Sequence, residues 1–248
     1  MTIDKQFDAE RVEGIKALGA DAEMNAVSNQ WLSTAQKNQY SYNFDWMGLP
    51  IIQYPQDIVA MQEIIWKVKP DLIIETGIAR GGSLIFYSSM LELLSSCGHG
   101  DGSVVAVDID IRDHNRQAIE AHPMAKRIEM IQGSAIAPEI VDQIKARAEG
   151  KKRVLISLDS NHTHDHVLEE LRAYAGLTSI GSYIVAFDTL VEDISDEAIG
   201  NRPWGKGNNP KTAVWEYLKE DDRFEIDASI HQKLQVTVAP DGFLKRVK

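Results

Sequence analysis

The sequence predicts an α/β fold in which a mostly parallel sheet lies between layers of helices. From residue 70 onward, short apolar runs alternate with amphipathic stretches, beginning with DLIIET, SLIFYSSMLELL, SVVAVDID and NRQAIEAH. The alternation continues through RIEMIQG, PEIVDQIKARAE, KRVLISLD, DHVLEELRAYAGL and SYIVAFD. Strand followed by helix, repeated, is typical of parallel strands joined by helical crossovers.

The C-terminal part predicts how the sheet is completed. KTAVWEYLKED has helical spacing, and RFEIDASI and LQVTVAPDGFLKRV follow as two strands with no helix between them. Such strands form a hairpin, so we expect the last strand to be antiparallel to the others. Five parallel strands and this hairpin give a seven-stranded sheet, which is the plan of the Rossmann-like class I methyltransferase sandwich.

One helix before the sheet is well marked. QDIVAMQEIIWKVK places Ile58, Met61, Ile65 and Val68 at helical spacing, and Pro70 ends the pattern. The apolar side chains share one face, so this helix is expected to pack on the sheet.

The flanking segments define the domain organisation. Residues 5–37 contain helix formers with scattered apolar positions, which predicts one or two short helices outside the main core. We therefore expect a helical and irregular extension at 1–54 and the methyltransferase domain at 55–248. Residues 189–210 have no clear period, so we expect a functional lid or substrate loop there, or a short helix.

Composition excludes several classes of function. No apolar run approaches the roughly 18 residues that span a bilayer. The first residues lack the basic and apolar regions of an export signal, and Cys97 is the single cysteine, so we expect a cytoplasmic protein. There are 26 Lys and Arg residues against 37 Asp and Glu, with no basic cluster. Nucleic acid is therefore not an expected partner, because phosphate contacts dominate such binding.

A glycine-rich turn, ETGIARGGS, follows the first strand of the alternating region. Gly77 and the glycine pair after Arg80 let the backbone turn tightly and approach a ligand. The turn departs from the dinucleotide fingerprint, because Ala79 stands at its middle glycine. Glu75 repels anions and suits an ammonium or sulfonium group, and Asp108 ends the next strand, where it can hydrogen-bond ribose hydroxyls. These features favour S-adenosylmethionine over a dinucleotide.

A second polar cluster lies in LISLDSNHTHDHVLEEL. Asp159 ends a strand, His162 follows in the turn, and Thr163 is expected to be the N-cap of the next helix. We expect His164 to be solvated, whereas packing and support of the site are equal alternatives for His166. The segment nearly matches the zinc-hydrolase pattern H-x-H-x-D-H but is one residue short.

Linked motifs from residue 43 to the C-terminus resemble the cephalosporin hydroxylase/rhamnosyl O-methyltransferase family. They include NFDWMGLPIIQYPQDI, KPDLIIETGIARGGSLIFYSSMLE, VVAVDIDIR, LDSNHTHDHVLEELRAY, GSYIVAFDT and NPKTAVWEYL. The resemblance implies an S-adenosylmethionine-dependent O-methyltransferase that forms a homo-oligomer. The implied acceptor is a small molecule or glycan, with lipopolysaccharide sugars, nucleotide-sugars and secondary metabolites all open.

The resemblance also assigns site residues. It implies that the methionine end of the cofactor contacts Glu75, Gly77, Gly81 and Ser83, the ribose Asp108, and the adenine Gly133 and Ser134. The remaining expected cofactor-binding residues in the same motifs are Thr76, Arg80, Gly82, Ile109, Asp159 and Ser160.

The resemblance further implies that Asp159 and Asp188 hold a divalent cation such as Mg²⁺, and that His162 is the general base. An alcohol is a weak nucleophile at neutral pH, so a base and a cation that chelates neighbouring hydroxyls both aid methyl transfer. Relatives carry a further carboxylate where this chain has Phe187, which puts metal dependence in question.

Three alternatives remain open from the sequence: a zinc hydrolase, an NAD-dependent oxidoreductase and a non-catalytic scaffold. The glycine turn argues against NAD, and Phe187 is the feature that favours a scaffold. Several aromatic residues stand outside the cofactor motifs. Trp204 is expected either to stack on a sugar or to pack its loop, and Tyr42, Phe44 and Trp46 either to line the acceptor pocket or to pack as core.

Overall fold

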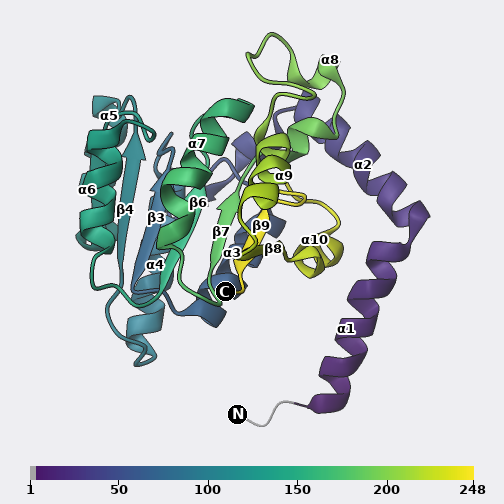
Figure 1. Ribbon diagram of the computed structural model, residues 1–248, viewed down its shortest axis with the longest axis horizontal. Helices are drawn as coiled ribbons and strands as arrows, with labels where there is room; N and C mark the ends of the chain where they lie inside the picture. The colour runs from purple at the N-terminus through teal and green to yellow at the C-terminus, as the bar shows by residue number, and fades with distance from the viewer. Residues whose placement is uncertain (1–3) are drawn as a thin grey trace.

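The computed structural model describes residues 4–248 and contains a seven-stranded sheet (Figure 1). The strand order is β5-β4-β3-β6-β7-β9-β8. All neighbouring pairs from β5 to β7 are parallel, whereas β9 is antiparallel to both β7 and β8. The predicted Rossmann-like sheet with an antiparallel last strand is therefore confirmed. Its strands are β3 (Leu72–Thr76), β4 (Ser103–Asp108), β5 (Ile128–Gln132), β6 (Val154–Leu158), β7 (Tyr183–Ala186), β8 (Phe224–Ile226) and β9 (Phe243–Arg246).

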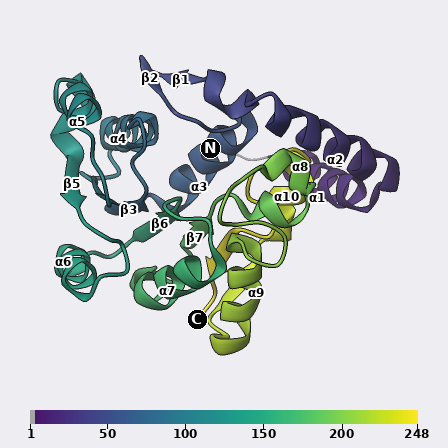
Figure 2. The same cartoon turned by 90° about the horizontal axis from the view of Figure 1, so that it is seen from above.

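Helices cover both faces of the sheet, as the view from above shows (Figure 2). One face packs against α3 (Pro55–Val68), α4 (Gly82–Ser96) and α5 (Asp113–Glu120). The other packs against α6 (Pro138–Ala148), α7 (His164–Tyr174) and α9 (Pro210–Glu220). Short 3-10 turns connect some of these elements: η2 (Pro123–Arg127) and η3 (Ala175–Leu177).

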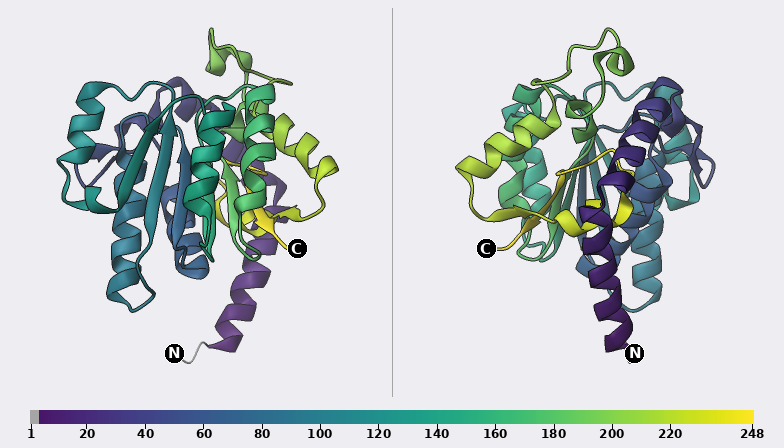
Figure 3. Two further views of the ribbon diagram at one scale, coloured as in Figure 1. Left: turned by 60° about the vertical axis from the view of Figure 1, so that its left-hand side comes forward. Right: turned by 90° about the vertical axis from the view of Figure 1, so that its right-hand side faces the viewer.

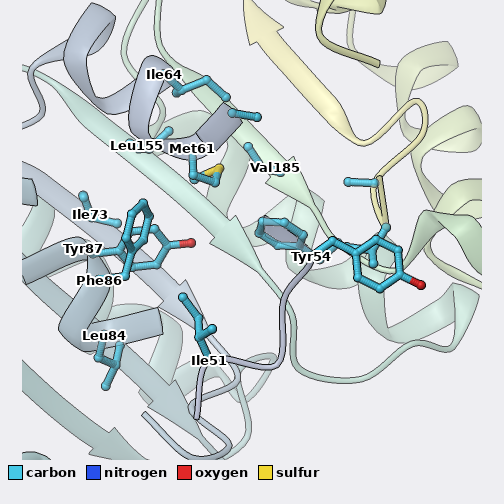
Figure 4. Close-up of a cluster of buried hydrophobic side chains, with 14 of the residues drawn as sticks. Ile51, Tyr54, Met61, Ile64, Ile73, Leu84, Phe86, Tyr87, Leu155 and Val185 are labelled. Atoms are coloured by element: carbon cyan, nitrogen blue, oxygen red, sulfur yellow. The ribbon is translucent and has the colours of Figure 1, made fainter. Parts of the chain in front are cut away.

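The hydrophobic core has two parts because side chains alternate between the faces of each strand. In β3, Ile73 packs with α3 and α4, whereas Leu72 and Ile74 belong to the opposite cluster. Figure 4 shows the first cluster, in which Met61 and Leu155 lie near Ile73. Each such side chain contributes about 1.5–3 kcal/mol when fully buried. This rigid layer fixes the strand ends that carry the polar motifs.

Residues 5–37 form two helices, α1 (Lys5–Ala20) and α2 (Ala22–Lys37), as expected, but both are longer than expected and α2 is not outside the core. Asp21 separates them and caps α2, because its Oδ1 accepts from the backbone N–H of Met24 at 2.9 Å. α1 contacts α10 near its C-terminal end, where Gln235 Nε2 donates to the carbonyl of Leu18, and its N-terminal end extends beyond the body (Figures 1 and 3); none of its side chains is buried. α2 returns to the body, where Leu32 and Ala35 join the core. The turn η1 (Tyr40–Asn43) and the hairpin β1 (Asp45–Trp46) and β2 (Leu49–Pro50) lead to α3.

The prediction for the last two strands is wrong in one respect. A helix, α10 (Ala228–Leu234), lies between β8 and β9, and LQVTV is not a strand. LQVTV does not pair as a strand because a buried carboxylate on α3 binds it: Asp57 accepts from the backbone N–H of Val238 at 3.0 Å and from the hydroxyl of Thr237. The hydroxyl of Thr237 and the N–H of Val238 therefore hydrogen-bond to a side chain of α3 and not to a neighbouring strand.

The segment expected to be a lid or loop carries two short helical pieces, η4 (Thr189–Glu192) and α8 (Asp196–Ile199). It projects from the edge of the sheet where the parallel strands end (Figure 3). Within residues 4–248, no helix combines the length and apolar character needed to cross a membrane.

Candidate active site

A cavity of about 870 Å³ opens at the carboxyl ends of the parallel strands. It lies where strand order reverses, because β3 neighbours β4 on one side and β6 on the other. Ligands of open α/β sheets bind at such switch points. Both predicted motifs contribute to its wall, the glycine turn through Gly77 and the second cluster through Asp159 and His162.

The glycine turn brings β3 and β6 into close contact. Gly77 has φ +91°, and a Cβ at this position would lie 2.0 Å from the carbonyl oxygen of Asp159. A Cβ on Gly82, at the start of α4, would lie 2.3 Å from the carbonyl oxygen of Pro50. Both approaches are to backbone and cannot be relieved by a rotamer change. The turn therefore needs glycine for space as well as for φ.

Glu75 is an acidic group just before this turn and is 2% exposed. The hydroxyl of Ser83 donates to Glu75 Oε2 at 2.9 Å. Burial raises the pKa of Glu75 well above its usual range, and the nearby carboxylates of Asp159 and Asp108 act in the same direction. A bound ammonium or sulfonium group would offset that burial and repulsion.

Asp108, at the end of β4, organises the turn. Its Oδ2 accepts from the backbone N–H groups of Ile78 at 2.8 Å and Ala79 at 3.3 Å. Asn115, which the sequence did not single out, donates from its side chain to the carbonyl of Ala79 at 2.7 Å. Ala79 has φ +45°, and this pair of contacts holds it there.

The other expected cofactor residues are distributed around the turn. Arg80, Ser83 and Ser160 line the cavity, whereas Thr76 is buried within β3. Beyond β4, Ile109 is exposed, and Gly133 and Ser134 follow β5. Gly133 is tied to the same edge, because its N–H donates to the carbonyl of Asp108 at 2.9 Å.

Asp159, His162 and Asp188 form the polar centre of the cavity. His162 lies between the two carboxylates, with Nδ1 3.1 Å from Asp188 Oδ2 and Nε2 3.4 Å from Asp159 Oδ1. One ligand atom from each residue lies within 4.8 Å of the others. β6 and β7 are neighbours, so the predicted pairing of Asp159 with Asp188 is confirmed. Asp188 has φ +54°, an uncommon conformation that is found at functional sites.

The two carboxylates control the protonation of the imidazole. Burial disfavours the charged ring, but Asp188 and Asp159 outweigh it and raise the pKa of His162 to about 9. Burial, followed by the charge of Asp188, raises the pKa of Asp159 to about 6. At neutral pH the imidazolium is therefore the cation that balances this acidic pair.

We expect the ring protons of His162 to titrate near pH 9 in metal-free protein when followed by NMR. Replacement of Asp188 by Asn should lower this pKa toward its usual value near 6.5, since the main attractive charge is lost. Because the folded-state pKa is the higher one, stabilisation by the imidazolium is complete below about pH 6.5 and is lost as pH rises through about 9. A midpoint that does not change in the Asp188 variant would contradict this assignment.

Of the other histidines of the segment, His164 serves packing and His166 supports the site. The prediction that His164 is solvated is wrong: its Nδ1 lies 2.8 Å from Thr212 Oγ1, which ties α7 to α9. His166 Nε2 lies 3.2 Å from the hydroxyl of Ser160, so it supports the cavity wall. Thr163 is the N-cap residue, but its side chain does not cap the helix.

Aromatic residues reach the cavity from two loops. Trp204 lines it and packs edge-on against His162, with ring centroids 4.8 Å apart. Tyr42 also lines the cavity, which is the first of the two expectations for these aromatic residues. Phe44 and Trp46 pack against the core, which is the second. No sequence pattern indicated Gln53, whose Nε2 donates to Asp159 Oδ2 at 3.2 Å.

The family model Rhamnosyl O-methyltransferase/CmcI matches residues 38–247, which include both motifs and the cavity. The chain belongs to this family. The expectation of a class I O-methyltransferase is confirmed at the level of the family. The glycine turn and the Asp159, His162 and Asp188 cluster both lie within the matched residues.

Relatives with sequence similarity to this chain are named rhamnosyl O-methyltransferase. Rhamnosyl O-methyltransferase of Mycobacterium tuberculosis is 28% identical over 208 residues, covering 81% of this chain and 77% of the relative. The Mycobacterium leprae protein of the same name is 29% identical over 203 residues, covering 81% and 82%. Among solved structures, CmcI described with magnesium and S-adenosylmethionine has a TM-score of 0.57 at 17% identity, covering 84% of this chain and 78% of that one. An O-methyltransferase from Bacillus cereus with S-adenosylhomocysteine has 0.52 at 16%, covering 83% and 82%.

Proposed function

We propose that this member of the Rhamnosyl O-methyltransferase/CmcI family transfers a methyl group from S-adenosylmethionine to a hydroxyl of a sugar or sugar-containing acceptor. One observation carries the proposal: a single cavity contains both the glycine turn and the Asp159, His162 and Asp188 cluster. A methyl donor at the turn and a hydroxyl beside His162 would share one enclosed space, which is what an in-line displacement requires.

The cofactor is proposed to bind along the edge formed by β3, β4 and β5. Glu75, Gly77, Gly81 and Ser83 would contact its methionine end, Asp108 its ribose, and Gly133 and Ser134 its adenine. The buried acidic Glu75 and the close-packed glycine backbone fit a cationic ligand that approaches the main chain. When bound, S-adenosylmethionine supplies an electrophilic methyl group.

A divalent cation such as Mg²⁺ is proposed to bind Asp159 and Asp188. Oxygen ligands are those that Mg²⁺ prefers, and one or two carboxylates with water suffice. Ligand atoms of the two carboxylates lie within 4.8 Å of each other, so the donor set fits. A bound cation supplies charge that lowers the pKa of a coordinated hydroxyl.

His162 is proposed to accept the proton of the acceptor hydroxyl. Its ring contacts both carboxylates and Trp204, so its position in the cavity is fixed from three sides. Charge compensation of Asp159 and Asp188 by another cation would lower the pKa of His162 from about 9, which leaves the ring able to take up a proton near neutral pH.

Trp204 is proposed to bind one face of the acceptor ring. We expect replacement by Ala to raise the acceptor KM about tenfold or more, because stacking on an aromatic contributes about 1–3 kcal/mol, while cofactor affinity is retained. Steady-state kinetics with varied acceptor would measure this change. An unchanged KM would assign Trp204 to packing of its loop alone.

No observation favours the other functions. A zinc hydrolase would need the histidines to converge, but His164 and His166 turn toward α9 and Ser160. NAD binding is opposed by the buried Glu75, and calorimetric titration with NAD and with S-adenosylmethionine would separate the two cofactors. Phe187 favours a scaffold only through the carboxylate it replaces, and it is buried in the core at 2% exposure while Asp159, His162 and Asp188 are all retained at the cavity.

The segment 1–54 is proposed to be an extension that joins copies of the chain in a homo-oligomer. It exposes large apolar side chains on α1 and α2, including Phe7 at 60% and Val27 at 57%. Light scattering of the full chain and of the Phe7→Asp, Val27→Asp variant would test this role. We expect the substitutions to reduce the molecular mass in solution, and an unchanged mass would reject this surface.

The proposed reaction is tested by an acceptor screen with labelled S-adenosylmethionine, with and without Mg²⁺. We expect label in a glycoside such as methyl rhamnoside or in a nucleotide-sugar, and less label after chelation. Binding of the cofactor without transfer to any hydroxyl acceptor would favour a scaffold instead.

A further inference from the structure

Gln53 is a buried polar side chain of the cavity wall with one unsatisfied atom. It is 8% exposed and lies just before α3. Its amide nitrogen donates to Asp159 Oδ2 at 3.2 Å, but its Oε1 is buried and has no hydrogen-bond partner among residues 4–248. A buried acceptor without a partner costs about 1–3 kcal/mol. This atom therefore needs an explanation that the protein alone does not supply.

The backbone before Gln53 is held in an unfavourable conformation. Ile52 has φ +51°, which is rare for a β-branched residue. Such a conformation costs on the order of 1–3 kcal/mol and persists where the surrounding structure imposes it. Ile52 and Gln53 both line the cavity, so the strained backbone delivers the amide to the polar centre.

We propose that Gln53 Oε1 is a third protein ligand of the divalent cation, together with Asp159 and Asp188. The inference rests on the proposed function, from which it takes the cation. Amide oxygen and nitrogen have nearly the same shape, so a flip of the side chain puts Oε1 where Nε2 lies, 3.2 Å from Asp159 Oδ2. Two neighbouring oxygens of an octahedral Mg²⁺, each about 2.1 Å from the ion, are about 3 Å apart.

The contacts of Asp159 explain why the amide directs Nε2, and not Oε1, toward this carboxylate when no cation is bound. Its two oxygens are met by donors, Nε2 of Gln53 on Oδ2 and the ring of His162 on Oδ1. Each donor satisfies a carboxylate that a cation would otherwise bind. The flip exchanges one hydrogen bond for coordination and at the same time gives Oε1 a partner.

A third oxygen ligand is important because only two carboxylates are available to the cation at this centre among the described residues. Phe187, next to Asp188, is buried in the hydrophobic core, and its side chain offers no oxygen. Two carboxylates are therefore the acidic oxygen ligands at this centre among the described residues. A neutral amide oxygen adds a ligand without adding negative charge beside Asp159, Asp188 and Glu75.

The test is titration of the cofactor-free protein with Mn²⁺, followed by the electron paramagnetic resonance signal of the free ion. Mn²⁺ takes the same oxygen ligands as Mg²⁺. Gln53→Met, which keeps the volume and removes the oxygen, should weaken binding on the order of ten- to a hundredfold. Gln53→Glu should strengthen it about tenfold or more, since ligand charge raises affinity. The control Gln36→Met alters another glutamine of the same cavity and should leave binding unchanged.

Two outcomes would overturn the inference. Equal Mn²⁺ affinity of wild type, Gln53→Met and Gln53→Glu would show that the amide is not a ligand, while the cation and the proposed reaction stand. A wild-type protein that binds no Mn²⁺ yet methylates its acceptor would remove the cation and this ligand but not methyl transfer. If Gln53→Met fails to fold, the Gln53→Glu variant still tests the opposite change in affinity, and a rise in Tm with added Mn²⁺ that is larger than in wild type supports it.

Discussion

Replacement of His162 by Ala is expected to lower kcat for methyl transfer about 100- to 10,000-fold, the range that general-base catalysis contributes. The imidazole is the one titratable base in contact with both Asp159 and Asp188 within the described cavity. S-adenosylmethionine affinity should change little, because the proposed cofactor contacts lie on the glycine turn and at the ends of β4 and β5.

The control for this variant is His99→Ala. His99 packs edge-on against Trp66 at 5.4 Å and precedes β4, at the opposite edge of the sheet. It should retain full activity. A His162→Ala enzyme with wild-type kcat would remove this residue from the chemistry, whereas a loss of activity that follows a loss of cofactor affinity would make it a binding residue.

Gly77→Ala is expected to abolish methyl transfer and to lower the free energy of unfolding by more than the strain of its φ alone. The added Cβ would lie 2.0 Å from the carbonyl oxygen of Asp159, so either the glycine turn or the end of β6 must move. Movement of β6 displaces Asp159 from His162 and Asp188. Chemical denaturation and a transfer assay measure the two effects.

Gly181→Ala separates strain from collision. Gly181 has φ +82°, close to that of Gly77, but a Cβ there meets nothing within 4 Å. It should cost only the left-handed penalty of about 1–2 kcal/mol and leave activity intact. Equal destabilisation in the two variants would contradict the importance of the contact between Gly77 and Asp159.

Local patterns predicted the sheet because short runs rich in apolar and β-branched residues alternate with amphipathic stretches. The same patterns predicted that Asp159 and Asp188 meet, since consecutive strands β6 and β7 are neighbours and their carboxyl ends share an edge. Polar side chains placed at strand ends are therefore visible in a single sequence, as Glu75 and Asp108 also illustrate.

Contacts between distant segments were not predictable in this way. Gln53 meets Asp159 across 106 residues, and nothing in the letters QYPQ indicates that Ile52 adopts φ +51°. LQVTV was wrongly expected to be a strand because Asp57 of α3 binds the backbone of Val238, 181 residues later. His164 was expected in solvent because its partner Thr212 lies on another helix. Each error arises from a polar group whose partner is far along the chain.

The negative charges that the fold places at the cavity match the positive charges of the proposed ligands. Three carboxylates, Glu75, Asp159 and Asp188, lie at or near one cavity, and burial makes the negative charge of Glu75 and Asp159 costly. The cations proposed to bind there, a sulfonium and a divalent metal ion, are those that would relieve it. The free protein uses the imidazolium of His162 in their place.

The most direct measurement of the central claim is the position of the transferred group, read by NMR of the acceptor after incubation with S-adenosylmethionine labelled with ¹³C in its methyl group. We predict a ¹³C-methyl ether on a hydroxyl of the sugar, formed by wild type and nearly lost in the His162→Ala enzyme. Label on nitrogen or carbon, or an equal yield of ether from both proteins, would contradict methyl transfer to oxygen at the Asp159, His162 and Asp188 centre.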